Sequence, residues 1–398
     1  MARVLRFFIV LSALASSGWL AGCASMPRMP YTAAEAAQAR VLDRDDLRRY
    51  VDDPLSAFGG ERAFGGPRNY LALSGGGADG AYGAGVLAGW SAAGNRPSFS
   101  IVSGVSTGAL IAPFAFLGPS YDETLRQLYT SGIAESLLED PNPLNAIFGS
   151  GLFGNQRLRE LVASYIDAKF VSDVADEYAK GRLLFVVTTN LDSQRSVIWN
   201  MGRIASLRTP ASLELFRNVV AASASIPAVF PPILVTAEAA NGATFQEMHV
   251  DGGVMSPVLT LPEAYLLRSA SGPKALSLQL YILMNNKIEP EFQVVRDRTL
   301  DIAARASSTM IKAQTRSILY NTYAVARRNK FGFHLSYIES DRPPSPAGFD
   351  TAYMRDLYQY GYDRARSGRA WSSAPPSDDA APAPVATQSS VRRVAGAR

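Results

Sequence analysis

Short apolar runs alternate with amphipathic stretches along the middle of the chain, between about residues 68 and 370. The runs have the length of buried strands, and the stretches between them repeat their apolar positions with a helical period. This pattern predicts strands over 70–74, 99–102, 183–188, 196–199, 278–285 and 333–338. It predicts helices over 82–92, 121–138, 157–168, 299–328 and 351–367, and one that begins at 107. Strands separated by helices favour an α/β sandwich with a largely parallel sheet, so we expect one domain over 68–370.

Both ends of the chain depart from this pattern. Residues 24–66 mix proline, alanine, glycine and charged residues, which predicts a linker over 23–67, with room for a helix within 33–50. Residues 371–398 are mostly alanine, proline, serine and scattered charges. A segment with so little to bury predicts a disordered tail.

The first residues are typical of an export signal. Arg3 and Arg6 precede an apolar run over 7–14, and Leu20-Ala-Gly-Cys23 follows. We therefore expect residues 1–22 to be a signal peptide. The last four residues resemble the bacterial lipobox, which implies cleavage before Cys23, lipidation of that cysteine and a lipid anchor in the bacterial cell envelope. Ala24, in place of an aspartate, implies the outer membrane. The alternative is a plain secretory signal or short anchor helix in which Cys23 is incidental.

Composition excludes several classes of protein. The 398 residues are 47% hydrophobic and 19% charged, as in globular proteins. The net charge is only +4, and half of it comes from the expected leader, so we expect no nucleic-acid partner. One cysteine allows no internal disulfide, and two histidines argue against a multi-histidine metal centre. We expect neither a cofactor nor a metal.

A glycine-rich loop follows the first predicted strand. Ser74-Gly-Gly-Gly-Ala-Asp-Gly80 opens a predicted helix and satisfies the spacing of a dinucleotide-binding fingerprint. That fingerprint needs an acidic residue about 20 positions further on, and none stands there. Successive glycines at a helix start also turn backbone N–H groups toward one point, as an oxyanion hole requires. The remaining alternative is a tight turn that needs glycine for steric reasons alone.

The second predicted strand leads into a G-x-S-x-G motif. Gly104-Val-Ser-Thr-Gly108 lies between an apolar strand and a predicted helix. In that context the motif places a serine on a sharp turn with its hydroxyl exposed above the sheet. Ser106 is therefore the candidate nucleophile.

Three side chains are candidate partners for Ser106. In one interpretation Asp251, which begins an Asp-Gly-Gly turn, accepts the serine proton directly. In the other, Ser106, Asp251 and His334 form a triad in the chain order of α/β-hydrolases. His249 is expected to be a structural histidine that lies near Asp251.

Together these motifs resemble those of patatin-like phospholipases. The glycine loop, Gly104–Gly108, the stretch over 222–232 and Asp251-Gly-Gly253 follow in the order of that family. The resemblance implies a three-layer α/β/α fold and a Ser106–Asp251 dyad without a catalytic histidine. It also implies oxyanion N–H groups from Gly75, Gly76 and Gly77, lipid acyl esters as substrates, and no required metal.

One residue departs from the family pattern. The family usually has arginine or lysine where this chain has Asp79. An acidic residue there disfavours anionic phospholipids and favours a neutral lipid, a lysolipid or a simple ester. Alternatively, Asp79 is a helix N-terminal residue favoured by the macrodipole.

A catalytically silent outer-membrane lipoprotein that binds lipid or a partner protein is the alternative to an enzyme.

Overall fold

The core of the molecule is a nine-stranded mixed sheet. The computed structural model describes residues 28–54, 68–138, 151–263, 278–343 and 348–376. The main path of the sheet runs β1-β5-β4-β3-β2-β8-β9, with β7 paired to β4 and β6 paired to β7. The strands are β1 (Arg48–Tyr50), β2 (Arg68–Leu73), β3 (Ile101–Val105), β4 (Leu183–Asn190), β5 (Arg195–Asn200), β6 (Ile233–Glu238), β7 (Thr244–Asp251), β8 (Leu278–Leu283) and β9 (Gly332–Ser336). The five strands β4, β3, β2, β8 and β9 are parallel to their neighbours in that row, which confirms a largely parallel central sheet.

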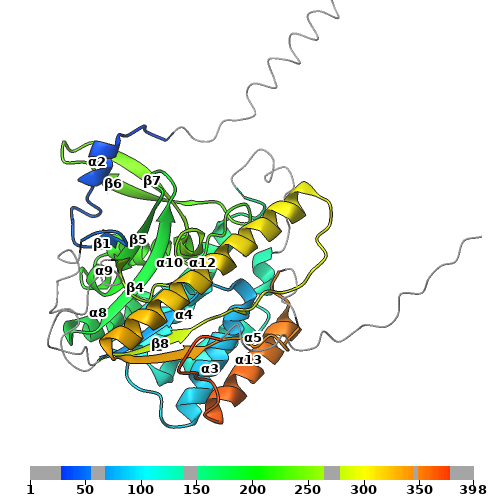
Figure 1. Ribbon diagram of the computed structural model, residues 1–398. Helices are drawn as coiled ribbons and strands as arrows, with labels where there is room; N and C mark the ends of the chain where they lie inside the picture. The colour runs from blue at the N-terminus through cyan, green and yellow to red at the C-terminus, as the bar shows by residue number, and fades with distance from the viewer. Residues whose placement is uncertain (1–27, 55–67, 139–150, 264–277, 344–347, 377–398) are drawn as a thin grey trace, which may run out of the picture.

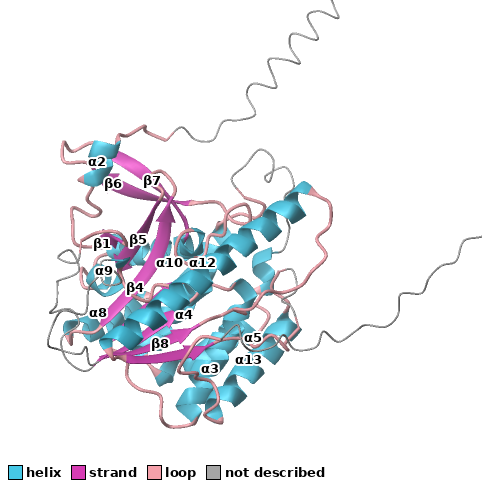
Figure 2. Ribbon diagram, in the orientation of Figure 1, coloured by secondary structure: helices cyan, strands magenta, loops and turns pink. Residues whose placement is uncertain are grey.

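Each face of the sheet is covered by helices. Along β2, Leu71 and Leu73 belong to one buried cluster, whereas Tyr70 and Ala72 belong to another on the opposite face. This alternation follows from the two-residue period of a strand. The three-layer α/β/α arrangement is therefore confirmed (Figures 1 and 2).

The two helical layers are unequal. One face carries most of the helices, which share the larger cluster: α3 (Gly80–Ala92), α4 (Thr107–Leu117), α5 (Asp122–Thr130), α7 (Gln156–Tyr165), α8 (Ala168–Ala179), α9 (Met201–Ala205), α10 (Pro210–Ser223) and α13 (Thr351–Arg366). The long helix α12 (Thr299–Asn329) lies across the other face (Figure 1). Its buried side chains Leu319 and Val325 share the second cluster with β2 and β8.

The segment before the glycine loop is more ordered than a linker. The structure gives only the five-residue helix α2 (Ala33–Ala37) within the range 33–50, and the same range ends in β1. This strand pairs antiparallel with β5. The buried Arg48 on β1 donates to Glu247 of β7, with Nη2 and Oε1 2.9 Å apart. The described residues 28–54 therefore belong to the folded body and are not the linker that composition predicts, whereas the rest of that range, 23–27 and 55–67, lies outside the described residues.

The folded body also extends past residue 370. Ser372 exchanges two backbone hydrogen bonds with Leu335 of β9, each 2.8 Å long. The ring of Trp371 packs 4.7 Å from that of Trp90. The expected tail therefore starts later than 371, and its part over 377–398 lies outside the described residues, as do the expected signal peptide and Cys23. Across the described ranges, every helix is too short or too polar to span a bilayer.

Candidate active site

Ser106 occupies a strained turn between β3 and α4. Its backbone has φ 55° and ψ −125°, a conformation that residues other than glycine rarely adopt. The turn is also tightly packed, because a Cβ on Gly104 would lie 2.2 Å from the Gly108 carbonyl oxygen. The two glycines of the motif are thus required by close backbone approach, and the serine stands where a nucleophile elbow places it.

Ser106 and Asp251 are brought into direct contact. The serine Oγ donates to the Asp251 Oδ2 at 2.5 Å, across 145 residues of sequence. Asp251 is the last residue of β7, and Thr188 of the neighbouring β4 stands opposite it. The other carboxylate oxygen, Oδ1, accepts from the Gly253 N–H at 2.7 Å. Ser106 and Asp251 are 6% and 5% exposed, so the hydrogen bond between them is almost out of contact with solvent.

Burial makes the Asp251 carboxylate unusually basic. Removal from water raises its pKa to about 6, although the hydrogen bonds from Ser106 and Gly253 both act to lower it. The effect of desolvation on the pKa exceeds the effect of these two hydrogen bonds, because both donors are neutral. A carboxyl group with this pKa is ionised at neutral pH and still accepts a proton more readily than an ordinary aspartate does.

The glycine loop lies against the serine, but only part of it is free to donate. A Cβ on Gly75 would lie 3.0 Å from the Ser106 Cβ. The Gly75 N–H, however, donates to the Pro257 carbonyl at 3.1 Å. The prediction that Gly75 supplies an oxyanion N–H is therefore not met in this structure. Among the described residues, no acceptor bonds to the N–H groups of Gly76 and Gly77, which remain as donors.

Asn285, which sequence reasoning missed, holds the glycine loop in place. It follows β8, and its side-chain Nδ2 and backbone N–H donate to the Ser74 carbonyl and Oγ, each at 2.8 Å. The contact is so close that a Cβ on Gly76 would lie 1.9 Å from the Asn285 carbonyl oxygen. Its place just beyond the carboxyl end of a parallel strand, where ligand sites gather, is the signal that points to it.

Ser223 is a second residue that sequence reasoning missed. Its Oγ accepts from the Ser106 N–H at 3.0 Å and donates to the Val187 carbonyl of β4 at 2.6 Å. The hydroxyl thereby ties the strained serine to the neighbouring strand. Ser223 lies within the stretch over 222–232, so the motif was visible although the role of this serine was not.

His249 lies near Asp251 along β7 but bonds elsewhere. Its Nε2 is 3.1 Å from Glu247 Oε2 and its Nδ1 is 2.9 Å from Thr188 Oγ1. A carboxylate only accepts, so in a neutral ring Nε2 carries the proton and Nδ1 accepts from the Thr188 hydroxyl, whose oxygen also accepts from the Trp199 Nε1–H at 2.8 Å. Burial lowers the pKa of His249, which is consistent with a neutral ring. This matches the expectation of a structural histidine.

His334 is far from the serine. It lies on β9, three strands away from β3, or about 14 Å at the usual strand spacing. Its Nε2 bonds to Gln279 Oε1 at 2.8 Å, and its ring stacks on Tyr281 at 4.4 Å. The structure therefore does not assemble the Ser106–Asp251–His334 triad.

Asp79 stands at the N-terminus of α3, as the macrodipole alternative requires. Its Oδ1 accepts from the Tyr353 hydroxyl of α13 at 2.8 Å. Both features expected of this residue, an acidic group near the glycine loop and a helix N-terminal position, are present together. Within the described ranges, no three histidine, cysteine or acidic side chains gather as a metal site.

The match to known proteins covers most of this site but not Asn285. Residues 71–263 match the family model described as patatin-like phospholipase. The match includes the glycine loop, the elbow and Asp251, and ends before β8 and α12. No curated protein matches the sequence.

Two solved structures show weak similarity to this chain. VipD from Legionella pneumophila is 14% identical with a TM-score of 0.31, and the match covers 76% of this chain and 67% of VipD. The type III effector protein ExoU is 12% identical with a TM-score of 0.26, over 76% of this chain and 53% of ExoU. The chain thus spans about half the length of ExoU.

Proposed function

We propose that this protein is a serine acyl hydrolase of lipid esters in which Ser106 is the nucleophile and Asp251 the general base. The observation that carries the proposal is the 2.5 Å hydrogen bond from Ser106 Oγ to a buried aspartate of raised pKa. The patatin-like phospholipase domain supports lipid acyl esters as the substrate class.

The reaction proceeds through an acyl-enzyme. Asp251 takes the Ser106 proton while Oγ forms a bond to the ester carbonyl carbon, and the N–H groups of Gly76 and Gly77 stabilise the oxyanion. The ester C–O bond then breaks, and the leaving alcohol takes the proton from Asp251. Water next attacks the acyl carbon and gives a proton to Asp251. Collapse of this intermediate breaks the bond to Ser106, returns the proton to Oγ and releases the fatty acid.

Exposed apolar side chains just after Asp251 and in the segment of α12 support a lipid surface as the place of reaction. Val254 and Met255 follow the Asp-Gly-Gly turn and are 41% and 37% exposed. Phe292, before α12, is 94% exposed, and Met310, in α12, is 72% exposed. Gln314 of α12 donates to the Met255 carbonyl, which joins the two segments. Large exposed apolar groups of this kind suit contact with a membrane better than contact with water.

Ester hydrolysis by matched variants tests the dyad. Ser106→Ala and Asp251→Asn should each lower kcat/KM on a short p-nitrophenyl ester by about 10³-fold or more, because the two groups act as a unit. His334→Ala is the matched control and should keep most of the rate. A large loss in His334→Ala, or full activity in Asp251→Asn, contradicts the dyad. A fluorophosphonate probe that fails to label Ser106 favours the catalytically silent alternative.

A second experiment tests the lipid surface. Phe292→Ser should lower the rate on phosphatidylcholine vesicles several-fold and leave the short soluble ester unchanged. Equal losses on both substrates would mean that Phe292 supports the site and not the lipid contact. Phosphatidylglycerol vesicles beside phosphatidylcholine vesicles test Asp79, because its charge predicts slower hydrolysis of the anionic lipid.

We also propose that residues 1–22 direct export and that Cys23 carries the lipid anchor in the outer membrane. The sole cysteine at the end of Leu-Ala-Gly-Cys supports this. Mass spectrometry of the N-terminal peptide should find acyl groups on Cys23 that Cys23→Ser lacks. An unmodified Cys23 in membrane-extracted protein contradicts the anchor.

A further inference from the structure

Ser74, the residue before the three glycines, is fully buried between two neighbouring strand ends. It follows β2, which lies between β3 and β8 in the sheet. Ser106 follows β3 on one side of it, and Asn285 comes soon after β8 on the other side. A group at this position can therefore decide which way the glycine loop faces.

The hydrogen bonds of the Ser74 hydroxyl fix the direction of its proton. Its Oγ accepts from the Asn285 backbone N–H at 2.8 Å and lies 2.8 Å from the Gly75 carbonyl oxygen. A carbonyl oxygen only accepts, so the Ser74 proton points to Gly75. Asn286 adds a longer bond to the same carbonyl, with its Nδ2 at 3.4 Å. The Gly75 carbonyl is therefore held on the β8 side of the loop.

Holding the Gly75 carbonyl also fixes the N–H group that follows it. The Gly75 carbonyl and the Gly76 N–H belong to one planar trans peptide unit, in which they point in opposite directions. Because the carbonyl faces the β8 side, the Gly76 N–H faces the β3 side, where Ser106 stands. Among the described residues, no acceptor bonds to this N–H. The Ser74 hydroxyl thus turns one donor toward the serine.

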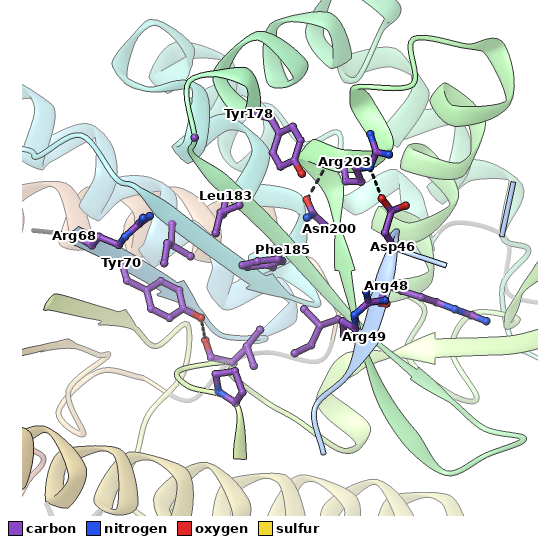
Figure 3. A pocket seen from close by; sticks show the side chains of 15 residues that line it. Asp46, Arg48, Arg49, Arg68, Tyr70, Tyr178, Leu183, Phe185, Asn200 and Arg203 are labelled. Atoms are coloured by element: carbon purple, nitrogen blue, oxygen red, sulfur yellow. Dashed lines mark hydrogen bonds and ion pairs between the residues drawn. The ribbon is translucent and has the colours of Figure 1, made fainter. Parts of the chain in front are cut away.

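The peptide unit before this one is held by other contacts. Its N–H, that of Gly75, donates to the Pro257 carbonyl at 3.1 Å. The segment that carries Pro257 is itself tied to β2, because the Tyr70 hydroxyl donates to the Leu259 carbonyl at 2.6 Å, beside a cavity of about 460 Å³ (Figure 3). Loss of the Ser74 hydroxyl would leave both of these bonds in place.

The peptide unit after it is held by a local turn. The Gly76 carbonyl accepts from the Asp79 N–H at 3.1 Å, and the Gly77 N–H belongs to the same peptide unit as that carbonyl. The second candidate donor therefore keeps its support without Ser74. Among the two donors, only the Gly76 N–H depends on the Ser74 hydroxyl.

We propose that Ser74 is a positioning residue, whose hydroxyl holds the Gly75 carbonyl and thereby aims the Gly76 N–H at the oxyanion of the tetrahedral intermediate. The inference rests on the proposed function, because this oxyanion forms only if Ser106 attacks an ester. Donors stabilise an oxyanion strongly when they are oriented before the reaction begins. A Gly76 N–H that is free to turn away contributes less, while the Gly77 N–H still donates.

A pair of substrates tests the proposal. The two are a short p-nitrophenyl ester and its thiono analogue, in which C=S replaces C=O. Sulfur is a weaker acceptor than oxygen, so N–H donors assist the ester more than the thiono ester. Ser74→Ala should lower kcat/KM on the ester by about tenfold to a hundredfold, somewhat less than the loss of a whole donor costs. The ratio of the two kcat/KM values, ester over thiono ester, should shrink several-fold.

This ratio separates positioning from general damage to the site. A change that only displaces Ser106 or Asp251 lowers both rates alike and leaves the ratio unchanged. Ser336→Ala is the matched control, because Ser336 is equally buried at the end of β9 and its Oγ bonds to the Tyr82 hydroxyl at 2.8 Å. It should keep the wild-type ratio.

Ser74→Cys is a second test of the same hydroxyl. A thiol is a weak donor, so this variant should shrink the ratio as Ser74→Ala does. It fills the space of the serine side chain and decides the question if Ser74→Ala does not fold. Folding of each variant is checked by circular dichroism.

Three outcomes overturn the proposal. It fails if folded Ser74→Ala or Ser74→Cys keeps the wild-type ratio, whether its rates are unchanged or equally lowered. A ratio that shrinks as much in Ser336→Ala would show a general effect of losing a buried hydroxyl. If wild type hydrolyses the ester no faster than Ser106→Ala, the proposed function fails and the inference fails with it. Failure of the ratio alone leaves the Ser106–Asp251 dyad intact.

Discussion

Replacing Asp251 with asparagine should make the protein more stable at neutral pH while removing its activity. The folded chain holds the Asp251 pKa at about 6, and an unfolded aspartate has a pKa of about 3.9. Between these values the unfolded chain ionises before the folded chain does. The folded state therefore loses stability as the pH rises from about 4 to about 6, and the loss stays constant above that.

The size of this loss follows from the two pKa values. Linkage gives about 1.5 kcal/mol lost by pH 5 and about 3 kcal/mol by pH 8, relative to acid pH. Asparagine carries no proton to lose, and its amide still has an acceptor for Gly253 and a donor for Ser106. The difference in free energy of unfolding between Asp251→Asn and wild type should therefore be about 1.5 kcal/mol larger at pH 8 than at pH 5, in favour of the variant.

Urea unfolding of both proteins at the two pH values measures this difference, with tryptophan fluorescence as the signal. Glu247→Gln is the matched control, four residues earlier on β7. Burial alone would raise the pKa of Glu247, but hydrogen bonds from His249 and Arg48 outweigh burial and bring it to about 2. A lowered pKa contributes stability above the unfolded value of about 4.3, so this contribution is complete at both pH values.

The two variants should therefore behave oppositely. Glu247→Gln leaves the buried charge of Arg48 without its partner, so its free energy of unfolding should fall by about 3–5 kcal/mol. The loss should be nearly the same at pH 5 and pH 8. The stability difference between Asp251→Asn and wild type should grow with pH. If that difference is the same at both pH values, the pKa of Asp251 is not raised and the reasoning is refuted.

Three further predictions concern the same site. The kcat/KM of the wild type on a soluble ester should rise with pH and level off above about pH 6, because Asp251 must be ionised; a rate that stays flat down to pH 4.5 contradicts this. Ser106→Gly should be about 1 kcal/mol more stable than Ser106→Ala in urea, since glycine relieves the strain at φ 55°; equal stability would mean that the turn is not strained. Gly76→Ala should lose activity at least tenfold and about 2 kcal/mol of stability, because its Cβ meets the Asn285 carbonyl oxygen at 1.9 Å. Gly154→Ala, whose Cβ meets nothing within 4 Å, is its control, and parallel losses would point to a general effect of alanine.

Sequence reasoning succeeded where a local pattern determines local structure. The apolar run before Gly104 predicts β3, and the G-x-S-x-G spacing predicts the turn that the structure shows at Ser106. The helix over 299–328 agrees with α12 to within one residue at its end. The parallel sheet was predicted from the alternation of such elements, because the apolar pattern within each segment identifies it as a strand or a helix.

Elements without a strong period were missed. The hairpin of β6 and β7 alternates buried and exposed positions, but its polar inward residues Glu247 and His249 obscure the pattern. These two polar groups are tolerated inside because they bond to each other and to Arg48. Arg48 lies 199 residues from Glu247, in a segment that composition alone marks as a linker. No local window contains both partners.

The same long-range contacts decide which glycine donates. Gly75, Gly76 and Gly77 are equivalent in the sequence motif. In the structure the N–H of Gly75 is occupied, because it donates to the Pro257 carbonyl. Asn285 then fixes the loop from a strand 211 residues away. The motif therefore predicts the place of the proposed oxyanion hole, and the tertiary contacts determine which N–H groups are available to it.

The contrast between two carboxylates on β7 explains how the proposed base could act without a histidine. Glu247 and Asp251 are both buried. Glu247 bonds to the guanidinium of Arg48 and to His249, whereas Asp251 accepts hydrogen bonds from the neutral Ser106 hydroxyl and the Gly253 N–H. Charge on the partner, not burial, therefore separates a pKa of about 2 from one of about 6. The higher value is close to that of an ordinary histidine, about 6.5, so Asp251 accepts a proton at neutral pH as a histidine would. A cation within hydrogen-bond distance of Asp251 would remove this property, which gives the apolar surroundings of the carboxylate a chemical role.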